Sequence, residues 1–255
     1  MEFKSIVEKN FNEWKEQSTC QEAVRLNEDI GKEYFDSANP HFFTGDVNSE
    51  LVLVHLNPKR NKDLWNKECT ISSFDEYWDS FAQFGKRNYG IDSTRNHKSP
   101  FDHKQIRFLR PFELFPIDNP DKYLNLENVM DRKLQLELVP YGSPDFSYKT
   151  IGIENLKPFA ERLLSVIDSK KRKYVIFCGK VFQPILKDFI FDQKIHNFKL
   201  NKNNGTQTLS DFQVINIKLK TNKGEINACI APQFAKQGYP EGEYGKKVKE
   251  LYEIT

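Results

Sequence analysis

The stretch ELVLVHLNP, residues 50–58, decides the fold class. Its residues 51–56 form an apolar run that only His55 interrupts, which is typical of a strand buried on both faces of a parallel sheet. The run stops at Asn57-Pro58, because proline lacks a backbone N–H and fixes a turn. We therefore predict a buried strand over residues 50–56, with the Asn57 amide at the rim of the sheet.

Three more segments predict the neighbouring strands of this sheet. KLQLELV (133–139) alternates and stops before Pro140, YVIFC (174–178) is continuously apolar, and INACI (226–230) is the last in the chain. A hairpin is predicted from residues 195–200 and 212–219, because Asn203-Asn204-Gly205 between them is a strong turn signal.

Helical signals alternate with these strands. Helices are predicted over about 1–35, 72–84, 154–167, 180–189 and 243–254. Turn residues dominate 39–46, and residues 85–125 are predicted to include irregular structure. This order predicts the fold class α/β: a three-layer sandwich with a mainly parallel central sheet and helices on both faces. We expect a single domain over 1–255, with residues 1–45 as an N-terminal helical segment packed on it.

The composition excludes several classes of protein. Aromatic residues make up 13% of the 255 residues, whereas disordered chains contain few. No apolar run is long enough to span a bilayer, and the first residues have no signal-peptide core, so we expect a cytoplasmic protein without a membrane partner. The four cysteines include no C-x-x-C pair, which argues against a zinc ribbon, a redox motif or a disulfide framework.

Several kinds of site are also excluded. The turn after the first strand has no glycine, which argues against a dinucleotide or P-loop site, and there is no G-x-S-x-G nucleophile elbow. The spacing of His97 and His103 with Asp92 and Asp102 matches no metal template. We therefore predict neither a metal nor a cofactor.

The residues just past each strand are the candidates for function, because open α/β sheets bind ligands at the carboxyl ends of their strands. A carboxylate such as Glu137 among apolar neighbours is costly unless a lysine pairs with it or a ligand binds it. Gly179-Lys180 is predicted to open a helix, where backbone N–H groups favour anions. Basic, polar and aromatic residues on the loop after the last strand suit a nucleic-acid surface. The predicted nucleic-acid contacts are Lys59, Arg60, Ser143, Lys180, Lys236 and Gln237.

Four segments in this order resemble the uracil-DNA glycosylase superfamily. VLVHLNP (52–58) is similar to its first motif, an apolar strand ending in G-x-D/N-P, and LELVP (136–140) to the strand that carries a base-reading asparagine. VIFCGK (175–180) is similar to its third strand and turn, and CIAPQ (229–233) to its last strand leading into H-P-S. Glu137 stands in the place of that asparagine and Gln233 in the place of the histidine.

The resemblance implies an enzyme that flips a nucleotide out of DNA and hydrolyses its N-glycosidic bond. It assigns Asn57 to orienting the attacking water and Gln233 to donating a hydrogen bond to the departing base. An amide is not a general base and glutamine cannot be protonated like histidine, so any enzyme is predicted to be slow. The predicted substrate-binding residues are His55, Pro58, Glu137 and Tyr141.

Glu137 predicts a base other than uracil. An ionised carboxylate only accepts hydrogen bonds, so it repels uracil O4 and accepts from an exocyclic amine. Two alternatives to a glycosylase remain: an inactive member of the same fold that binds nucleic acid or protein, and a metal-dependent nuclease or nucleotide hydrolase. We expect a monomer whose partner is nucleic acid, most simply DNA.

Overall fold

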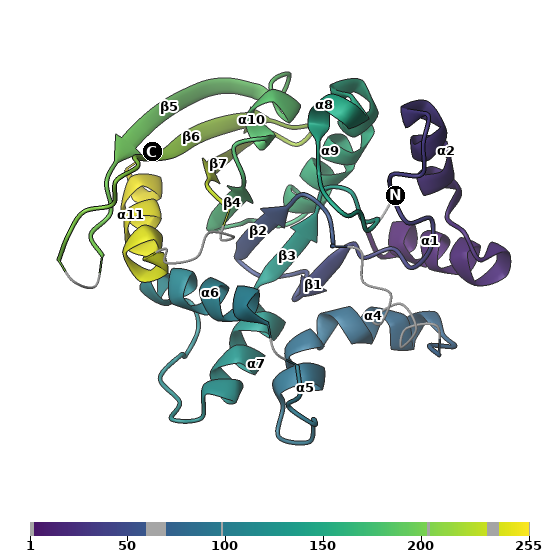
Figure 1. Cartoon of the computed structure of the whole chain (residues 1–255), viewed down its shortest axis with the longest axis horizontal. Coiled ribbons are helices and arrows are strands. Elements are labelled where there is room, and N and C mark those ends of the chain that lie inside the picture. Colours follow the sequence, from purple (N-terminus) through teal and green to yellow (C-terminus); the bar gives the residue numbers. More distant parts are fainter. Residues whose placement is uncertain (1–2, 60–69, 98, 203–204, 234–239, 255) are drawn as a thin grey trace.

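The computed structural model describes residues 3–59, 70–97, 99–202, 205–233 and 240–254. A seven-stranded sheet runs through its centre in the order β1-β3-β2-β4-β7-β6-β5 (Figure 1). The strands are β1 (Phe43–Gly45), β2 (Leu51–His55), β3 (Leu134–Glu137), β4 (Tyr174–Cys178), β5 (Ile190–Phe198), β6 (Phe212–Lys220) and β7 (Glu225–Ala231).

The sheet is mixed rather than mainly parallel. Strands β3, β2, β4 and β7 are parallel, whereas β1 pairs antiparallel with β3, and β6 pairs antiparallel with both β7 and β5. The prediction of a mainly parallel sheet holds only for its centre. Crossover connections allow parallel pairing there, and a short turn between Lys220 and Glu225 makes β6 and β7 antiparallel.

Helices are packed around this sheet. They are α1 (Phe3–Gln17), α2 (Gln21–Ile30), α4 (Phe74–Ala82), α5 (Phe84–Tyr89), α6 (Pro100–Leu109), η1 (Arg110–Phe112), α7 (Lys122–Arg132), α8 (Tyr148–Ile151), α9 (Ile153–Ile167), α10 (Phe182–Ile185) and α11 (Glu241–Glu253). None of these described helices has the length and apolar character needed to cross a bilayer.

Three local predictions need correction, and a fourth needs an addition. Residues 85–125 include irregular structure as predicted, and they also contain most of α5, all of α6 and the start of α7; Ser99 and Asp121 cap the last two of these helices. The first 35 residues form two helices, since Ser18 between them has a φ of 61°. The turn region 39–46 contains β1, and the helix predicted over 180–189 is only the four residues of α10.

Alternation along β2 divides the core into two clusters. Val52 and Val54 belong to one cluster, which includes apolar side chains of α1, α4 and α9. Leu51 and Leu53 belong to the other, which includes side chains of α6, α7 and α11. Each face of the strand thus buries its own set of residues.

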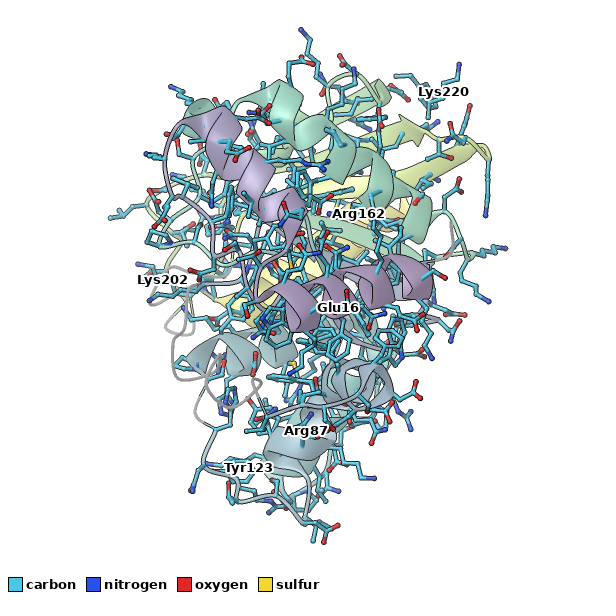
Figure 2. All side chains as sticks on the ribbon, turned by 90° about the vertical axis from the view of Figure 1, so that its right-hand side faces the viewer. Glu16, Arg87, Tyr123, Arg162, Lys202 and Lys220 are labelled. Atoms are coloured by element: carbon cyan, nitrogen blue, oxygen red, sulfur yellow. The ribbon has the colours of Figure 1, made fainter. Side chains whose placement is uncertain are left out.

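An ion pair holds the N-terminal helices to the rest of the fold. Arg162 of α9, labelled in Figure 2, donates from Nη1 to both carboxylate oxygens of Glu22 on α2, at 2.8 and 3.0 Å. Tyr141 is buried between these regions, and its hydroxyl lies 3.0 Å from Asn10 Oδ1 and 2.9 Å from Glu22 Oε2.

Candidate functional site

The carboxyl ends of the four parallel strands meet at one edge of the sheet. Glu137 of β3 is in register with His55 of β2, and Cys178 of β4 with Ala231 of β7. Because the pairing of Val54 with Phe177 aligns β2 with β4, all four ends are level. This edge is the one at which the sequence places its candidate residues.

Asn57 ties together the loops that follow β2 and β3. Its Nδ2 lies 3.0 Å from Pro58 O, 3.1 Å from Tyr141 O and 2.8 Å from Ser143 Oγ. The Ser143 amide also donates to Pro58 O at 3.2 Å. No described residue donates to Asn57 Oδ1, so this oxygen remains as an acceptor at the edge of the sheet.

A row of polar side chains lies along one side of β3. Lys133 Nζ donates to Gln135 Oε1 at 2.8 Å, and Gln135 Nε2 donates to Glu137 Oε1 at 2.8 Å. We call Lys133, Gln135 and Glu137 the polar row. The Gln135 amide connects a buried ammonium to a carboxylate, and it leaves Glu137 Oε2 outside the hydrogen bonds of the row. Oε2 is buried and receives no hydrogen bond from a described residue.

Burial sets the protonation of the groups at this edge. It raises the pKa of Glu137 to about 7, opposed by the hydrogen bond from Gln135 and by His41 and Lys133. It lowers the pKa of Lys133 to about 8. Burial and the charge of Lys133 also lower the pKa of His55 to about 3, so His55 is neutral at pH 7. Glu137 and Lys133 are thus the groups of this set that titrate closest to neutrality, whereas His55 does not.

Helix α6 covers the polar row. Gln105 is fully buried and donates from Nε2 to Gln135 Oε1 at 3.2 Å, while Phe101 packs edge-on against His55 with ring centroids 5.2 Å apart. Asp102 accepts from the Tyr89 hydroxyl at 2.5 Å. Burial raises the pKa of Asp102, but hydrogen bonds from His97 and Tyr89 and the charge of Lys133 outweigh it and hold the pKa below its ordinary value.

Of the polar row and the α6 residues that cover it, only Glu137 has a role predicted from the sequence. The alternation in KLQLELV contained a signal: polar residues at 133, 135 and 137 share one face of a strand whose two faces are both covered. Gln105 and Tyr89 had no such signal, because only the fold brings Gln105 to Gln135 and Tyr89 to Asp102.

The β4 and β7 ends form the other half of the edge. The Gly179 amide donates to Ala231 O at 2.7 Å, and a Cβ built on Gly179 would lie 3.3 Å from Gln233 Cγ. Two strand spacings, about 10 Å, separate β2 from β7, and Asn57 and Gln233 each lie two residues past the end of one of these strands. Lys180 is exposed, but the helix that follows is too short to provide the anion site predicted there.

The remaining predicted residues are distributed as follows. Lys59 is exposed and forms a parallel bridge with Ser143, which is itself buried; its hydroxyl donates to Asp145 O. The Tyr141 side chain is buried beneath the N-terminal helices, so only its backbone oxygen lies at the edge with the other predicted residues. Arg60, Lys236 and Gln237 lie outside the described residues.

The described part of the chain contains no cluster suited to metal binding, and its strand cysteines are buried. There, no group of three His, Cys, Asp or Glu side chains is arranged to hold a metal ion. Cys178 and Cys229 are fully buried, and burial raises the pKa of both thiols above the ordinary value.

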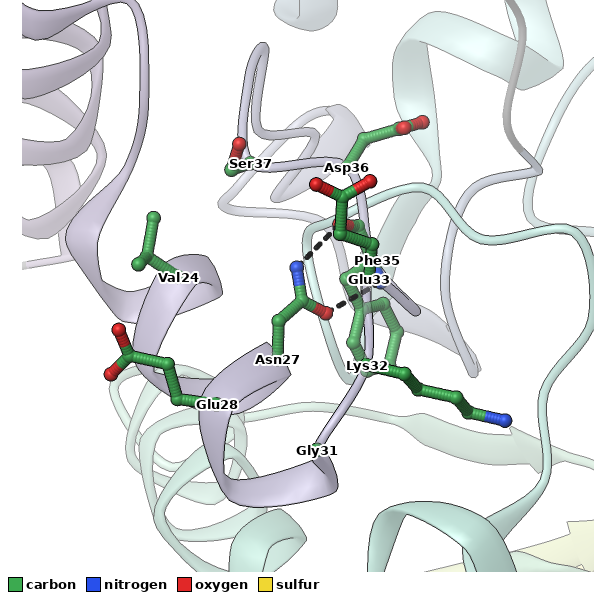
Figure 3. Close-up of a pocket in the computed structure, with 9 residues that line it drawn as sticks. All are labelled: Val24, Asn27, Glu28, Gly31, Lys32, Glu33, Phe35, Asp36 and Ser37. Carbon is green, nitrogen blue, oxygen red and sulfur yellow. Dashed lines mark hydrogen bonds between the residues drawn. The ribbon is translucent and has the colours of Figure 1, made fainter.

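A separate cleft of about 440 Å³ lies at the end of α2 (Figure 3). Asn27 shapes it by donating to Phe35 O at 2.8 Å and accepting from the Tyr34 and Phe35 amides. None of the predicted site residues lines this cleft.

Comparison with protein-family models, with curated proteins and with solved structures found no match. Function is therefore inferred from the chemistry of the site. The carboxyl edge offers a buried carboxylate oxygen, a neutral imidazole and an amide oxygen on neighbouring strands. Together these groups can accept hydrogen bonds from a planar polar ligand and orient a water.

Proposed function

We propose that this chain is a three-layer α/β sandwich of the uracil-DNA glycosylase kind, and that it excises a modified base other than uracil from DNA. The observation that carries the proposal is Glu137 Oε2, a buried acceptor without a donor among the described residues, at the sheet edge where ligands bind. A group left in this state is costly unless a ligand completes it.

The class of base follows from the chemistry of Glu137. Its Oε1 already accepts from Gln135, so Oε2 is the atom that faces the ligand. An exocyclic amine donates to this oxygen and stabilises the ionised carboxylate, whereas a carbonyl such as uracil O4 repels it. In its ionised form Glu137 therefore fits bases with an amino edge, of the cytosine or guanine type, better than uracil.

The bond cleavage assigned to this edge is hydrolysis at C1′. A water held by Asn57 Oδ1 attacks C1′, the glycosidic bond breaks, and the base leaves with the bonding electrons and takes up a proton. Gln233 supplies a hydrogen bond to the departing base. Since no general base is assigned at Asn57, the reaction is expected to be slow.

Binding without turnover is the second candidate, and the Asn57 contacts favour it. The Nδ2 atom holds the 57–59 and 141–143 loops together, so Asn57 has a structural reason to be present without catalysis. In that case the same edge binds a base or a nucleic-acid end and releases it unchanged.

A strand-cleavage assay in EDTA tests the proposal. Labelled single- and double-stranded oligonucleotides that carry uracil, deaminated purines, modified cytosines or mismatches are incubated with the protein, and hot alkali then breaks any abasic site. We expect breaks at an amino-bearing modified base, reduced at least about tenfold in Asn57→Ala and Glu137→Gln. The matched control is Asn48→Ala, an exposed asparagine before β2.

The outcomes of this assay distinguish base excision from binding without turnover. Breaks at uracil that survive in Glu137→Gln contradict the assigned base. Salt-sensitive binding without breaks supports the second candidate, because phosphate contacts weaken as salt rises. The absence of both breaks and binding overturns both candidates.

A further inference from the structure

Two donors fix the orientation of the Gln135 side-chain amide in the polar row. Its Oε1 accepts from Lys133 Nζ at 2.8 Å and from Gln105 Nε2 at 3.2 Å, and both of these donor residues are fully buried. An ammonium has three donors and no acceptor, so a reversed Gln135 amide would place N–H groups against N–H groups. Gln135 therefore directs its Nε2 toward Glu137, where it donates to Oε1 at 2.8 Å.

The hydrogen bond from Gln135 distinguishes the two oxygens of Glu137. In a protonated carboxyl group the oxygen that carries the proton is the donor, and the carbonyl oxygen is the better acceptor. Because Oε1 accepts from the Gln135 amide, a proton on this carboxyl belongs on Oε2. Oε2 is buried and has no hydrogen-bond partner among the described residues. In both forms it is thus the oxygen without a partner there: an acceptor when Glu137 is ionised and a donor when it is protonated.

We propose that Gln135 is a positioning residue that gives the carboxyl edge two classes of ligand: Glu137 Oε2 binds a heterocycle with an amino edge when the carboxyl is ionised, and one with a keto edge when it is protonated. An exocyclic amine donates to the carboxylate, whereas a keto oxygen accepts from the O–H group. The proposal rests on the proposed function, since it takes the ligand at this edge to be a base, and it adds a second class of base.

The groups around Glu137 allow both of its forms near neutral pH. Those that face Glu137 or Lys133 from the surrounding elements are His41 before β1, His55 of β2, Cys178 of β4, Asp102 of α6 and Asp131 of α7. Burial raises the pKa of Glu137 to about 7, against the opposing effects of the Gln135 hydrogen bond, His41 and Lys133. The pKa of Lys133 is about 8, so the ammonium still orients Gln135 where Glu137 changes form.

Two matched heterocycles test the pH dependence of binding. 1-Methylcytosine presents an exocyclic amine, whereas 1,3-dimethyluracil presents carbonyl oxygens and has no N–H group. NMR titrations of the protein measure both dissociation constants between about pH 6 and pH 8, where the ionised fraction of a carboxyl with a pKa of about 7 changes about tenfold. Over this interval we expect the affinity for 1-methylcytosine to rise at least about fivefold and the affinity for 1,3-dimethyluracil to fall at least about fivefold.

Glu137→Gln tests the positioning role of Gln135. The new amide accepts from Gln135 through its oxygen, so its N–H groups face the ligand at every pH. We expect this variant to bind 1,3-dimethyluracil without pH dependence, and to bind 1-methylcytosine at least about fivefold more weakly than the parent does at about pH 8. Combining Gln135→Leu with Glu137→Gln lets that amide turn, so the double variant is expected to bind both heterocycles with affinities within about twofold of each other. Gln193→Leu, at an exposed position of β5, is the matched control and is expected to change neither preference.

The outcomes separate this proposal from the proposed function. The same pH dependence for both heterocycles, or a keto preference that survives in the double variant, overturns the positioning role and leaves base excision to the cleavage assay. Binding of neither heterocycle at any pH overturns both proposals. Run at about pH 8, where Glu137 is ionised, the cleavage assay tests the amino-edged class alone. Thermal unfolding shows whether each variant folds, and the two pH profiles of the parent decide the proposal where a variant does not.

Discussion

The two strands that flank β2 bury very different side chains. All five residues of β4 are apolar and buried, including Ile176 and Cys178 on the face that α6 covers. Beside them on the same face of the sheet, the polar row joins an ammonium, an amide and a carboxylate by hydrogen bonds. The comparison shows that this sheet face tolerates ionisable groups as a connected set. The set ends in a carboxylate oxygen with no described donor, at the carboxyl edge of the sheet.

Removing Lys133, the first residue of the polar row, is expected to have the largest effect on stability. Lys133→Met removes the buried ammonium and leaves Glu137 and Asp102 without its charge, which is expected to lower the free energy of unfolding by about 3–5 kcal/mol. Urea unfolding measures this loss. Lys173→Met, at an exposed lysine before β4, is the control and is expected to change stability by less than about 0.5 kcal/mol.

Replacing the whole row sharpens that comparison. The triple variant of Lys133→Met, Gln135→Leu and Glu137→Leu makes β3 resemble β4, and it is expected to be more stable than Lys133→Met alone, because apolar residues often replace a buried ionic set without loss. A triple variant that is less stable than the single one would show that the row is needed for folding itself.

The pH dependence of stability comes next in size. Burial raises the pKa of Glu137 from 4.5 to about 7, so the carboxyl is stabilised in its protonated form. Its contribution is complete below pH 4.5 and is lost as the pH rises through 7. Glu137→Gln is therefore expected to gain up to about 3 kcal/mol relative to the parent over this interval. Urea unfolding at a series of pH values measures the difference, and a constant difference would contradict the raised pKa.

The smallest effect on stability is expected for a substitution in the apolar strand β4, which serves as the contrast to the polar row. Ile176→Val on β4 removes one buried methylene group and is expected to cost about 1 kcal/mol. No ionisable group is involved, so this cost should be the same from pH 4.5 to 7 in the same unfolding series. A cost that changes with pH would mean that β4 is coupled to the polar row.

The sequence predicted those elements whose signals are local. Apolar runs identify β2 and β4, and alternation identifies β3 with its stop at Pro140. The helices within 85–125 were missed because they are short and separated by turn residues, so none has a long periodic pattern. The edge strand β1 was missed for a related reason: its three residues are a strand only because β3 pairs with them.

The sequence predicted where the candidate site lies, but it did not predict which residues contact one another there. The end of each strand placed His55, Asn57 and Glu137 at the carboxyl edge. Two of the three acceptors around Asn57 Nδ2, and the packing of Gln105 on the polar row, come from residues 30 to 86 positions away in the chain. Such contacts depend on tertiary structure, which no local pattern contains.

The close approach of Gly179 to Gln233 has a consequence for how this chain can vary. Gly179 has a φ of 145°, and its missing Cβ is the space that the Gln233 side chain borders. A larger residue at 179 therefore requires the Gln233 side chain to move by a few tenths of an ångström or to be smaller, as well as a different backbone turn. The residues at the ends of β4 and β7 are linked in this way, so homologues of this chain should change positions 179 and 233 together.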